Sequence, residues 1–129
     1  MRVLLVDDCS EVRSRLAELL RELHGIEADE AGSTDEALEL LERSPANVVV
    51  VDIHMGGKNG LDLITEVTLR LPRALIIVLT NDTNHALWRE ALRRGASFFF
   101  DKSRDFERAV DAVVHCLVVA GARTKVGPS

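Results

Sequence analysis

The sequence lacks most of the features that would place it outside the ordinary globular domains. It has two cysteines, Cys9 and Cys116, too few for a disulfide framework. No apolar run approaches the length of a membrane span, and "MRVLLVDD" reaches aspartates too early for a secretory signal. Basic residues are scattered and outnumbered by acidic ones, 16 to 21, so the basic surface of a nucleic-acid binder is missing. These absences predict a cytoplasmic protein with no membrane segment and no direct nucleic-acid contact.

The composition that is present suits one compact domain. The chain has 129 residues, 47% of them hydrophobic and 29% charged, and it contains no internal repeat. We expect the domain to cover residues 1–121 and residues 122–129 to form a short frayed tail.

Two kinds of segment alternate along this domain. Short apolar or β-rich runs predict strands over 2–8, 26–31, 47–52, 74–80 and 96–101. Apolar residues at three- and four-residue steps predict helices over 10–23, 33–44, 61–71, 84–94 and 103–120. Ser33 and Glu36 have the spacing of a capping box at the start of the second helix. Strict alternation predicts an α/β fold, a flavodoxin-like doubly wound (βα)5 domain with a five-stranded parallel sheet in the order 2-1-3-4-5.

Polar side chains follow the predicted strands where they end at the carboxyl edge of the sheet. They are Asp7, Asp8, Asp52, Thr80 and Lys102. Taken singly, each residue is explained equally well by a structural role, as a helix cap, a turn residue or a solvated charge, and by a functional one. Together they form an acidic cluster that a cation or a chemical task must compensate.

Magnesium is the cation that suits this cluster. It prefers hard oxygen ligands and binds through one or two carboxylates together with phosphate oxygens. Zinc is disfavoured, because no cysteine and histidine pair has ligand spacing. An acidic crevice with a threonine and a lysine has the parts needed for phosphoryl transfer.

Four segments, "LLVDDCSEVR", "VVVVDIHMGGKNGLDLI", "IIVLTND" and "GASFFFDKS", together resemble the receiver domain of bacterial two-component response regulators. The resemblance covers residues 2–120, with the defining positions in order. It implies that Asp52 is the phospho-acceptor and that Lys102 pairs with Asp52 at rest and with a phosphoryl oxygen afterwards. It also implies that Thr80 donates its hydroxyl to the phosphoryl group, that Phe99 is the aromatic switch residue, and that Gly60 closes the loop after the acceptor.

The resemblance also assigns a Mg²⁺ site and two tuning positions. Asp8, Asp52 and the backbone carbonyl of His54 would bind the metal, and Asp7 would contribute mainly through metal-bound water. His54 and Asp82 occupy the positions that, in this family, adjust how fast the aspartyl phosphate hydrolyses.

Three positions depart from the family pattern. Gly56 stands where proline is common and loosens the loop beside the acceptor. Asn81 replaces a small residue and narrows access to Asp52. Ser103 follows Lys102 where proline is common, often after a cis peptide, and a cis bond before serine is far more costly.

The lone tryptophan, Trp88, shares a helical stripe with His85 and Leu92. It has two interpretations, partial burial in the core or an anchor on a partner surface. The resemblance implies that such a surface, formed by the helix over 84–94, the strand over 96–101 and the last helix, and including Phe99, binds a downstream protein or a second copy of the chain.

The leading hypothesis is a stand-alone receiver, phosphorylated by a sensor histidine kinase or a phosphotransfer protein, that catalyses only its own phosphoryl transfer and dephosphorylation. One alternative is an interaction module that no longer uses phosphate, motivated by the three departures. Another is an aspartate-nucleophile phosphatase, for which the chain lacks both the Asp-x-Asp arrangement and a cap domain.

Overall fold

The computed structural model describes residues 1–55 and 59–126, with side chains described up to residue 119. Within these ranges five strands and five helices alternate, as the sequence predicts. The strands are β1 (Arg2–Val6), β2 (Glu27–Ala31), β3 (Val48–Val51), β4 (Leu75–Thr80) and β5 (Phe98–Asp101). The helices are α1 (Ser10–Arg21), α2 (Thr34–Arg43), α3 (Gly60–Arg70), α4 (His85–Arg94) and α5 (Phe106–Val126). None of these helices combines the length and apolarity needed to cross a bilayer.

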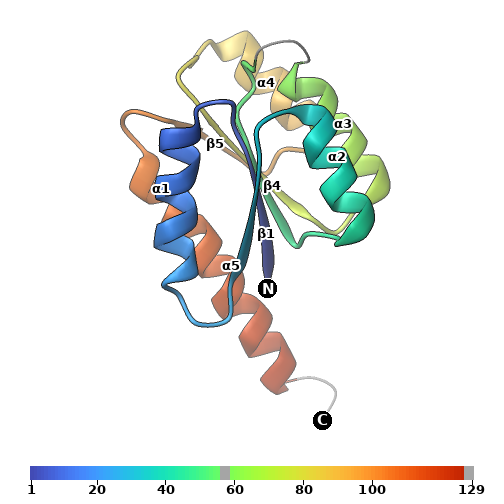
Figure 1. Ribbon diagram of the computed structural model, residues 1–129. Coiled ribbons are helices and arrows are strands. Elements are labelled where there is room, and N and C mark those ends of the chain that lie inside the picture. Colours follow the sequence, from blue (N-terminus) through green and yellow to red (C-terminus); the bar gives the residue numbers. More distant parts are fainter. Residues whose placement is uncertain (56–58, 127–129) are drawn as a thin grey trace.

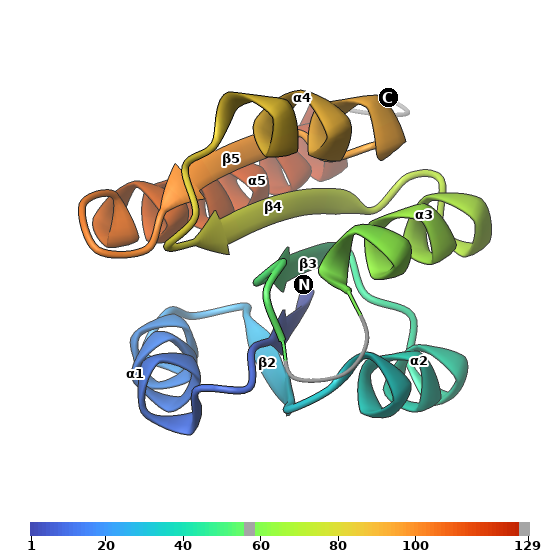
Figure 2. The ribbon, with the colours of Figure 1, turned by 90° about the horizontal axis from the view of Figure 1, so that it is seen from above.

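The strands form one parallel sheet in the order β2-β1-β3-β4-β5, which confirms the predicted topology (Figure 2). In the central strands Val6 is opposite Val51, and Val51 is opposite Val78. At the far side Thr80 is opposite Asp101. This register brings the residues that follow β1, β3, β4 and β5 to one edge of the sheet.

Each face of the sheet has its own hydrophobic core. Helices α1 and α5 cover one face, and α2, α3 and α4 cover the other (Figure 1). Side chains alternate along each strand, so Val49 and Val51 face the second layer while Val48 and Val50 face the first. Because both faces are covered, the central strands can be apolar throughout, as "VVVV" is.

Short polar side chains cap the N-terminal ends of three helices. Ser33 Oγ accepts the Glu36 N–H at 3.1 Å, so the predicted cap of α2 is present, and the Glu36 carboxylate in turn accepts the Gly32 N–H. Asn59 and Asn84 cap α3 and α4 in the same way, each accepting an N–H two residues on. The N-cap of α1 is Cys9, whose side chain makes no capping hydrogen bond.

The last helix is longer than the sequence predicts. We expected it to span residues 103–120, whereas α5 begins at Phe106 and continues to Val126. One glycine inside a helix costs only about 1 kcal/mol relative to alanine, and the alanine, arginine and lysine that follow favour the helix. The proline that would stop it occurs only at position 128.

Helix α4 is attached to the fold mainly at its C-terminal end. Ala91 is its only fully buried residue. Thr68 of α3 donates its hydroxyl to the Arg94 carbonyl at 3.0 Å, and the Arg94 guanidinium binds Asp62 of α3 at 3.0 Å. The helix then ends at Gly95, which has a φ of 125° and leaves no room for a Cβ beside the Thr68 hydroxyl.

Candidate functional site

Lys102 lies between two buried carboxylates at the carboxyl edge of the sheet. Its Nζ is 2.6 Å from Asp7 Oδ2 and 2.8 Å from Asp52 Oδ2, and the three side chains are 8–9% exposed. Burial alone would lower the pKa of the Lys102 ammonium, but its hydrogen bonds to Asp52 and Asp7 outweigh burial and hold that pKa above its usual value. The lysine is therefore a charged group shared by the acids that follow β1 and β3.

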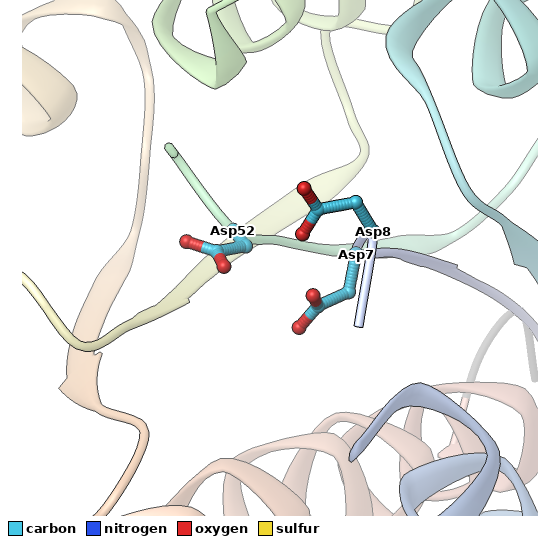
Figure 3. A group of neighbouring side chains, drawn as sticks. All are labelled: Asp7, Asp8 and Asp52. Atoms are coloured by element: carbon cyan, nitrogen blue, oxygen red, sulfur yellow. The ribbon is translucent and has the colours of Figure 1, made fainter. Parts of the chain in front are cut away.

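Asp7, Asp8 and Asp52 together form a group that can hold a metal ion. One carboxylate oxygen from each lies within 4.8 Å of the other two (Figure 3). Asp7 and Asp52 are buried, whereas Asp8 is exposed. All the candidate ligands are carboxylate oxygens, the ligands that Mg²⁺ prefers, so the residues fit Mg²⁺.

Asp52 is contacted by the loop that follows it and lies close to Gly60, the first residue of α3. Its Oδ1 accepts the His54 N–H at 3.2 Å. The Gly60 N–H donates to the Ile53 carbonyl at 2.9 Å, and a Cβ on Gly60 would lie 2.5 Å from the Asp52 carbonyl oxygen. Only glycine allows α3 to approach this closely, which explains why Gly60 stands at this position. Gly56 lies outside the described residues.

A pocket of about 750 Å³ opens over Asp52. It is lined by Asp8, Cys9, Asp52, His54, Thr80, Asn81, Asp82, Thr83, Asn84 and Lys102. Thr80 is 1% exposed, and its Oγ1 accepts the Asp82 N–H at 3.3 Å. The Thr80 hydroxyl therefore borders the pocket while it holds the loop that follows β4.

His54 and Asp82 contact each other at the rim of this pocket. His54 Nε2 lies 2.6 Å from Asp82 Oδ2. This hydrogen bond lowers the pKa of the Asp82 carboxyl, as does the backbone N–H of Asn84. The two residues that sequence reasoning named as tuning positions thus form one bridge, with His54 following β3 and Asp82 following β4.

The loop after β5 is organised around Asp101 rather than around a proline. Asp101 Oδ1 accepts both the backbone N–H and the hydroxyl of Ser103, at 2.9 and 2.8 Å, and these bonds lower the pKa of its carboxyl. The peptide bond between Lys102 and Ser103 is trans. The lysine reaches both acids in this arrangement, so the missing proline does not prevent its approach.

The aromatic residues named from the sequence lie at a second pocket, of about 350 Å³. It is lined by Thr83, His85, Trp88, Phe99, Asp101, Arg104 and Asp105. Trp88 is 40% exposed and contacts the edge of the His85 ring at a centroid distance of 6.2 Å. Phe99 is half-buried and packs against the hydrophobic core. Leu92 also packs against this core, but it lines neither of the two pockets. Thr83 lines both pockets, so the two pockets adjoin at this residue.

Sequence reasoning missed one side chain that contacts the acidic loop. Arg13 Nη1 donates to the Asp7 backbone carbonyl at 2.6 Å. Any donor can satisfy a main-chain carbonyl, so the sequence around Asp7 carries no sign of its partner. The α1 periodicity places Arg13 on the polar side of the helix, which is also where an ordinary solvated arginine would lie.

Comparison with known proteins agrees with this geometry. The profile of the response regulator receiver domain matches residues 3–114. The chemotaxis protein CheY of Thermotoga maritima is 34% identical over 112 residues, which are 87% of this chain and 93% of that protein. The transcriptional activator protein ExaE of Pseudomonas putida is 36% identical over 104 residues, or 80% of this chain. The match covers only 49% of ExaE, so the chain spans about half the length of that relative.

Solved structures show the same fold. The response regulator protein TrrA of Thermotoga maritima, solved in complex with Mg(2+)-BeF, has a TM-score of 0.77 and 32% identity over 88% of this chain and 96% of TrrA. A CheY-like receiver domain protein from Methanospirillum hungatei JF-1 has a TM-score of 0.85 over 95% of this chain and 97% of its own, and at 20% identity it supports the fold alone. With this profile match and these relatives, the chain belongs to the response regulator receiver domain family.

Proposed function

We propose that this chain is a phosphorylation-activated signalling receiver whose phospho-acceptor is Asp52. Receiver domains of two-component response regulators serve phosphorylation-dependent signalling in general, with a kinase or another phosphodonor as partner. One observation carries the assignment to Asp52. This carboxylate lines the pocket of about 750 Å³ and is paired with a buried ammonium at 2.8 Å.

The proposed reaction transfers a phosphoryl group from a phosphohistidine of a sensor kinase or phosphotransfer protein. A carboxylate oxygen of Asp52 forms the new bond to phosphorus. The bond from phosphorus to the histidine nitrogen breaks, and that nitrogen keeps the electron pair and takes up a proton. Lys102 exchanges its contact with Asp52 for a phosphoryl oxygen, and the Thr80 hydroxyl donates to another.

Asp8, Asp52 and the His54 carbonyl are the groups that would hold Mg²⁺, with Asp7 acting through metal-bound water. When bound, the metal would neutralise charge that develops on the phosphoryl oxygens. Asp7 Oδ1 accepts the Cys9 N–H at 2.8 Å and its other oxygen contacts Lys102, so it supports the site while remaining close to the two candidate ligands.

Hydrolysis would return the protein to its resting state. Water attacks phosphorus, the bond from phosphorus to the Asp52 oxygen breaks, and the carboxylate is regenerated. The bridge from His54 to Asp82 lies at the rim of the pocket, beside Asp52. We propose that this bridge limits water access and sets the lifetime of the phosphorylated form.

The phosphorylation signal would leave through the loop after β4. Thr80 holds the Asp82 N–H, so a shift of the Thr80 hydroxyl toward the phosphoryl group pulls this loop. Thr83 on the same loop lines the pocket formed by Trp88 and Phe99. A movement of Thr83 would alter the surface of α4, β5 and α5. We propose that a downstream protein or a second copy of the chain binds to this surface.

Intact-mass measurement after incubation with Mg²⁺ and a small phosphodonor tests the assignment. We expect an adduct of one phosphoryl group on the wild type and none on Asp52→Asn. Asp111→Asn, which removes an exposed acid on α5, serves as the matched control and should keep the adduct. An adduct that survives Asp52→Asn, or that never forms on the wild type, would overturn the proposal.

Tryptophan fluorescence tests the proposed signal path. Trp88 is the only tryptophan in the chain, so its emission reports on the α4 surface without labelling. We expect the emission to change when a phosphoryl mimic is added, and Thr80→Ala to reduce that change. An emission that stays constant in the phosphorylated wild type would refute the path through the loop after β4.

A further inference from the structure

Arg13 of α1 links three parts of the fold at the acidic loop. Its Nη1 donates to the Asp7 carbonyl oxygen at 2.6 Å, and its Nε donates to the Glu30 carboxylate of β2 at 3.1 Å. Its side chain is only 18% exposed. The guanidinium thus joins α1 and β2 to the residue that follows β1.

The carbonyl that Arg13 contacts belongs to the peptide unit between Asp7 and Asp8. The rest of Asp7 is also held, because its N–H donates to the Ala31 carbonyl at 3.1 Å and its carboxylate accepts from Cys9 and Lys102. This peptide unit ends at the Asp8 Cα, so a displacement of the unit would move the Asp8 carboxylate, one oxygen of which lies within 4.8 Å of an Asp52 oxygen. A hydrogen bond to the carbonyl of the unit from a charged donor resists that displacement.

Arg13 is itself held in place by Glu30. This carboxylate accepts from Arg13, from the Ser14 hydroxyl at 3.1 Å and from Arg21 at 3.4 Å. Burial alone would raise the pKa of the Glu30 carboxyl, but the bonds from Arg13 and Ser14 outweigh it and lower that pKa. Glu30 is therefore charged at neutral pH and fixes the guanidinium that reaches Asp7.

We infer that Arg13 is a positioning residue for the Mg²⁺ site, acting through the peptide unit that joins the two acids. The inference rests on the proposed function for the identity of that site. Outer contacts that orient metal ligands typically contribute a factor of 10 to 100 in affinity.

Positioning and simple charge effects predict opposite results at this residue. Arg13 is a cation near the place where another cation would bind, so its charge alone weakens Mg²⁺ binding. Removing Arg13 should then tighten binding if only its charge mattered. If Arg13 holds the peptide unit, its removal should weaken binding. The sign of the change separates the two roles.

Calorimetric titration of the unphosphorylated full chain with MgCl₂ alone measures this sign. We expect Arg13→Ala to weaken binding roughly tenfold. Arg13→Lys should recover part of the loss, because an ammonium can still donate to the Asp7 carbonyl. Arg21→Ala is the matched control, because within the described part of the chain Arg21 binds Glu30 and the Ala28 carbonyl and not Asp7. This variant should leave the affinity unchanged.

A second variant covers the case in which Arg13→Ala fails to fold. Glu30→Gln removes the charged anchor but keeps the guanidinium, and it should weaken Mg²⁺ binding by about threefold, in the same direction. Equal or tighter binding in a folded Arg13→Ala variant, or in Glu30→Gln if the first does not fold, would overturn the inference. A wild type that binds no Mg²⁺ would instead overturn the proposed function, and the inference with it.

Discussion

Replacing Lys102 by methionine removes the cation that two buried carboxylates share. The ammonium contacts Asp7 and Asp52 at 2.6 and 2.8 Å, and all three side chains are 8–9% exposed. At an effective dielectric constant near 20, each contact is worth about 6 kcal/mol of Coulomb attraction. The cost of removing the ammonium from water offsets several kcal/mol of the total, and breaking a buried pair from one side usually costs about 3 to 5 kcal/mol.

We therefore expect Lys102→Met to lower the free energy of unfolding by about 4 kcal/mol at pH 7 without divalent metal. The loss should be smaller in the Asp52→Asn background, because one of the two carboxylates is then neutral. Mg²⁺ should restore part of the loss, since a bound cation neutralises the same acids.

Urea unfolding followed by circular dichroism, with a chelator and then with MgCl₂, measures both effects. Arg108→Met is the matched control. Its guanidinium is 74% exposed and contacts Asp105 at 3.8 Å, so its removal should cost less than about 0.5 kcal/mol. If Lys102→Met costs as little as the Arg108 variant, the buried pair contributes no more than a surface ion pair and the reasoning fails.

Three further predictions follow from the geometry. Gly60→Ala should destabilise the fold by about 2 to 3 kcal/mol in the same urea assay, because a Cβ would lie 2.5 Å from the Asp52 carbonyl oxygen. An unchanged urea midpoint would contradict this expected steric clash. The lowered pKa of Glu30 means that its stabilising contribution is complete above the unfolded-state pKa and is lost as the pH falls through the folded one. As the pH falls below about 5, the wild type should therefore lose more stability than Glu30→Gln. Parallel profiles of unfolding free energy against pH for the two proteins would show that the Glu30 carboxylate does not contribute this stability. His54→Ala should shorten the lifetime of phosphorylated Asp52 on the order of threefold, because it opens the rim of the pocket. Mass spectrometry after removal of the phosphodonor measures this lifetime. A lifetime equal to or longer than that of the wild type would count against the proposed role of the bridge to Asp82.

The order of the sheet and the contact between Asp52 and Lys102 could be predicted from the sequence, because both follow from the direction of the strands. In a parallel sheet with covered faces, the residue after each strand reaches the same edge, so Asp52 and Lys102 had to approach each other although they are 50 positions apart. The strands β1, β3 and β4 are apolar nearly throughout, which indicates that they lie at the centre of the sheet, with both faces covered.

Other features depend on side-chain paths that spacing does not encode. His54 and Asp82 follow different strands, and nothing in either segment indicates that their side chains meet. The contact from Arg13 ends on a main-chain carbonyl, which every residue carries. The last helix was expected to end at residue 120, whereas the helix propensity on both sides of Gly121 outweighs the cost of that glycine.

The attachment of α4 has a consequence for how the molecule opens locally. Its C-terminal turn is tied to α3 through Arg94, while Ala91 is its only fully buried residue. Local opening free energy falls where few apolar contacts must break, so the amides near the N-terminal end of α4 should exchange with deuterium faster than those of α3. Asn84, the N-cap of α4, lines the pocket over Asp52, so the first turns of α4 can open at the edge of that pocket while the sheet stays intact.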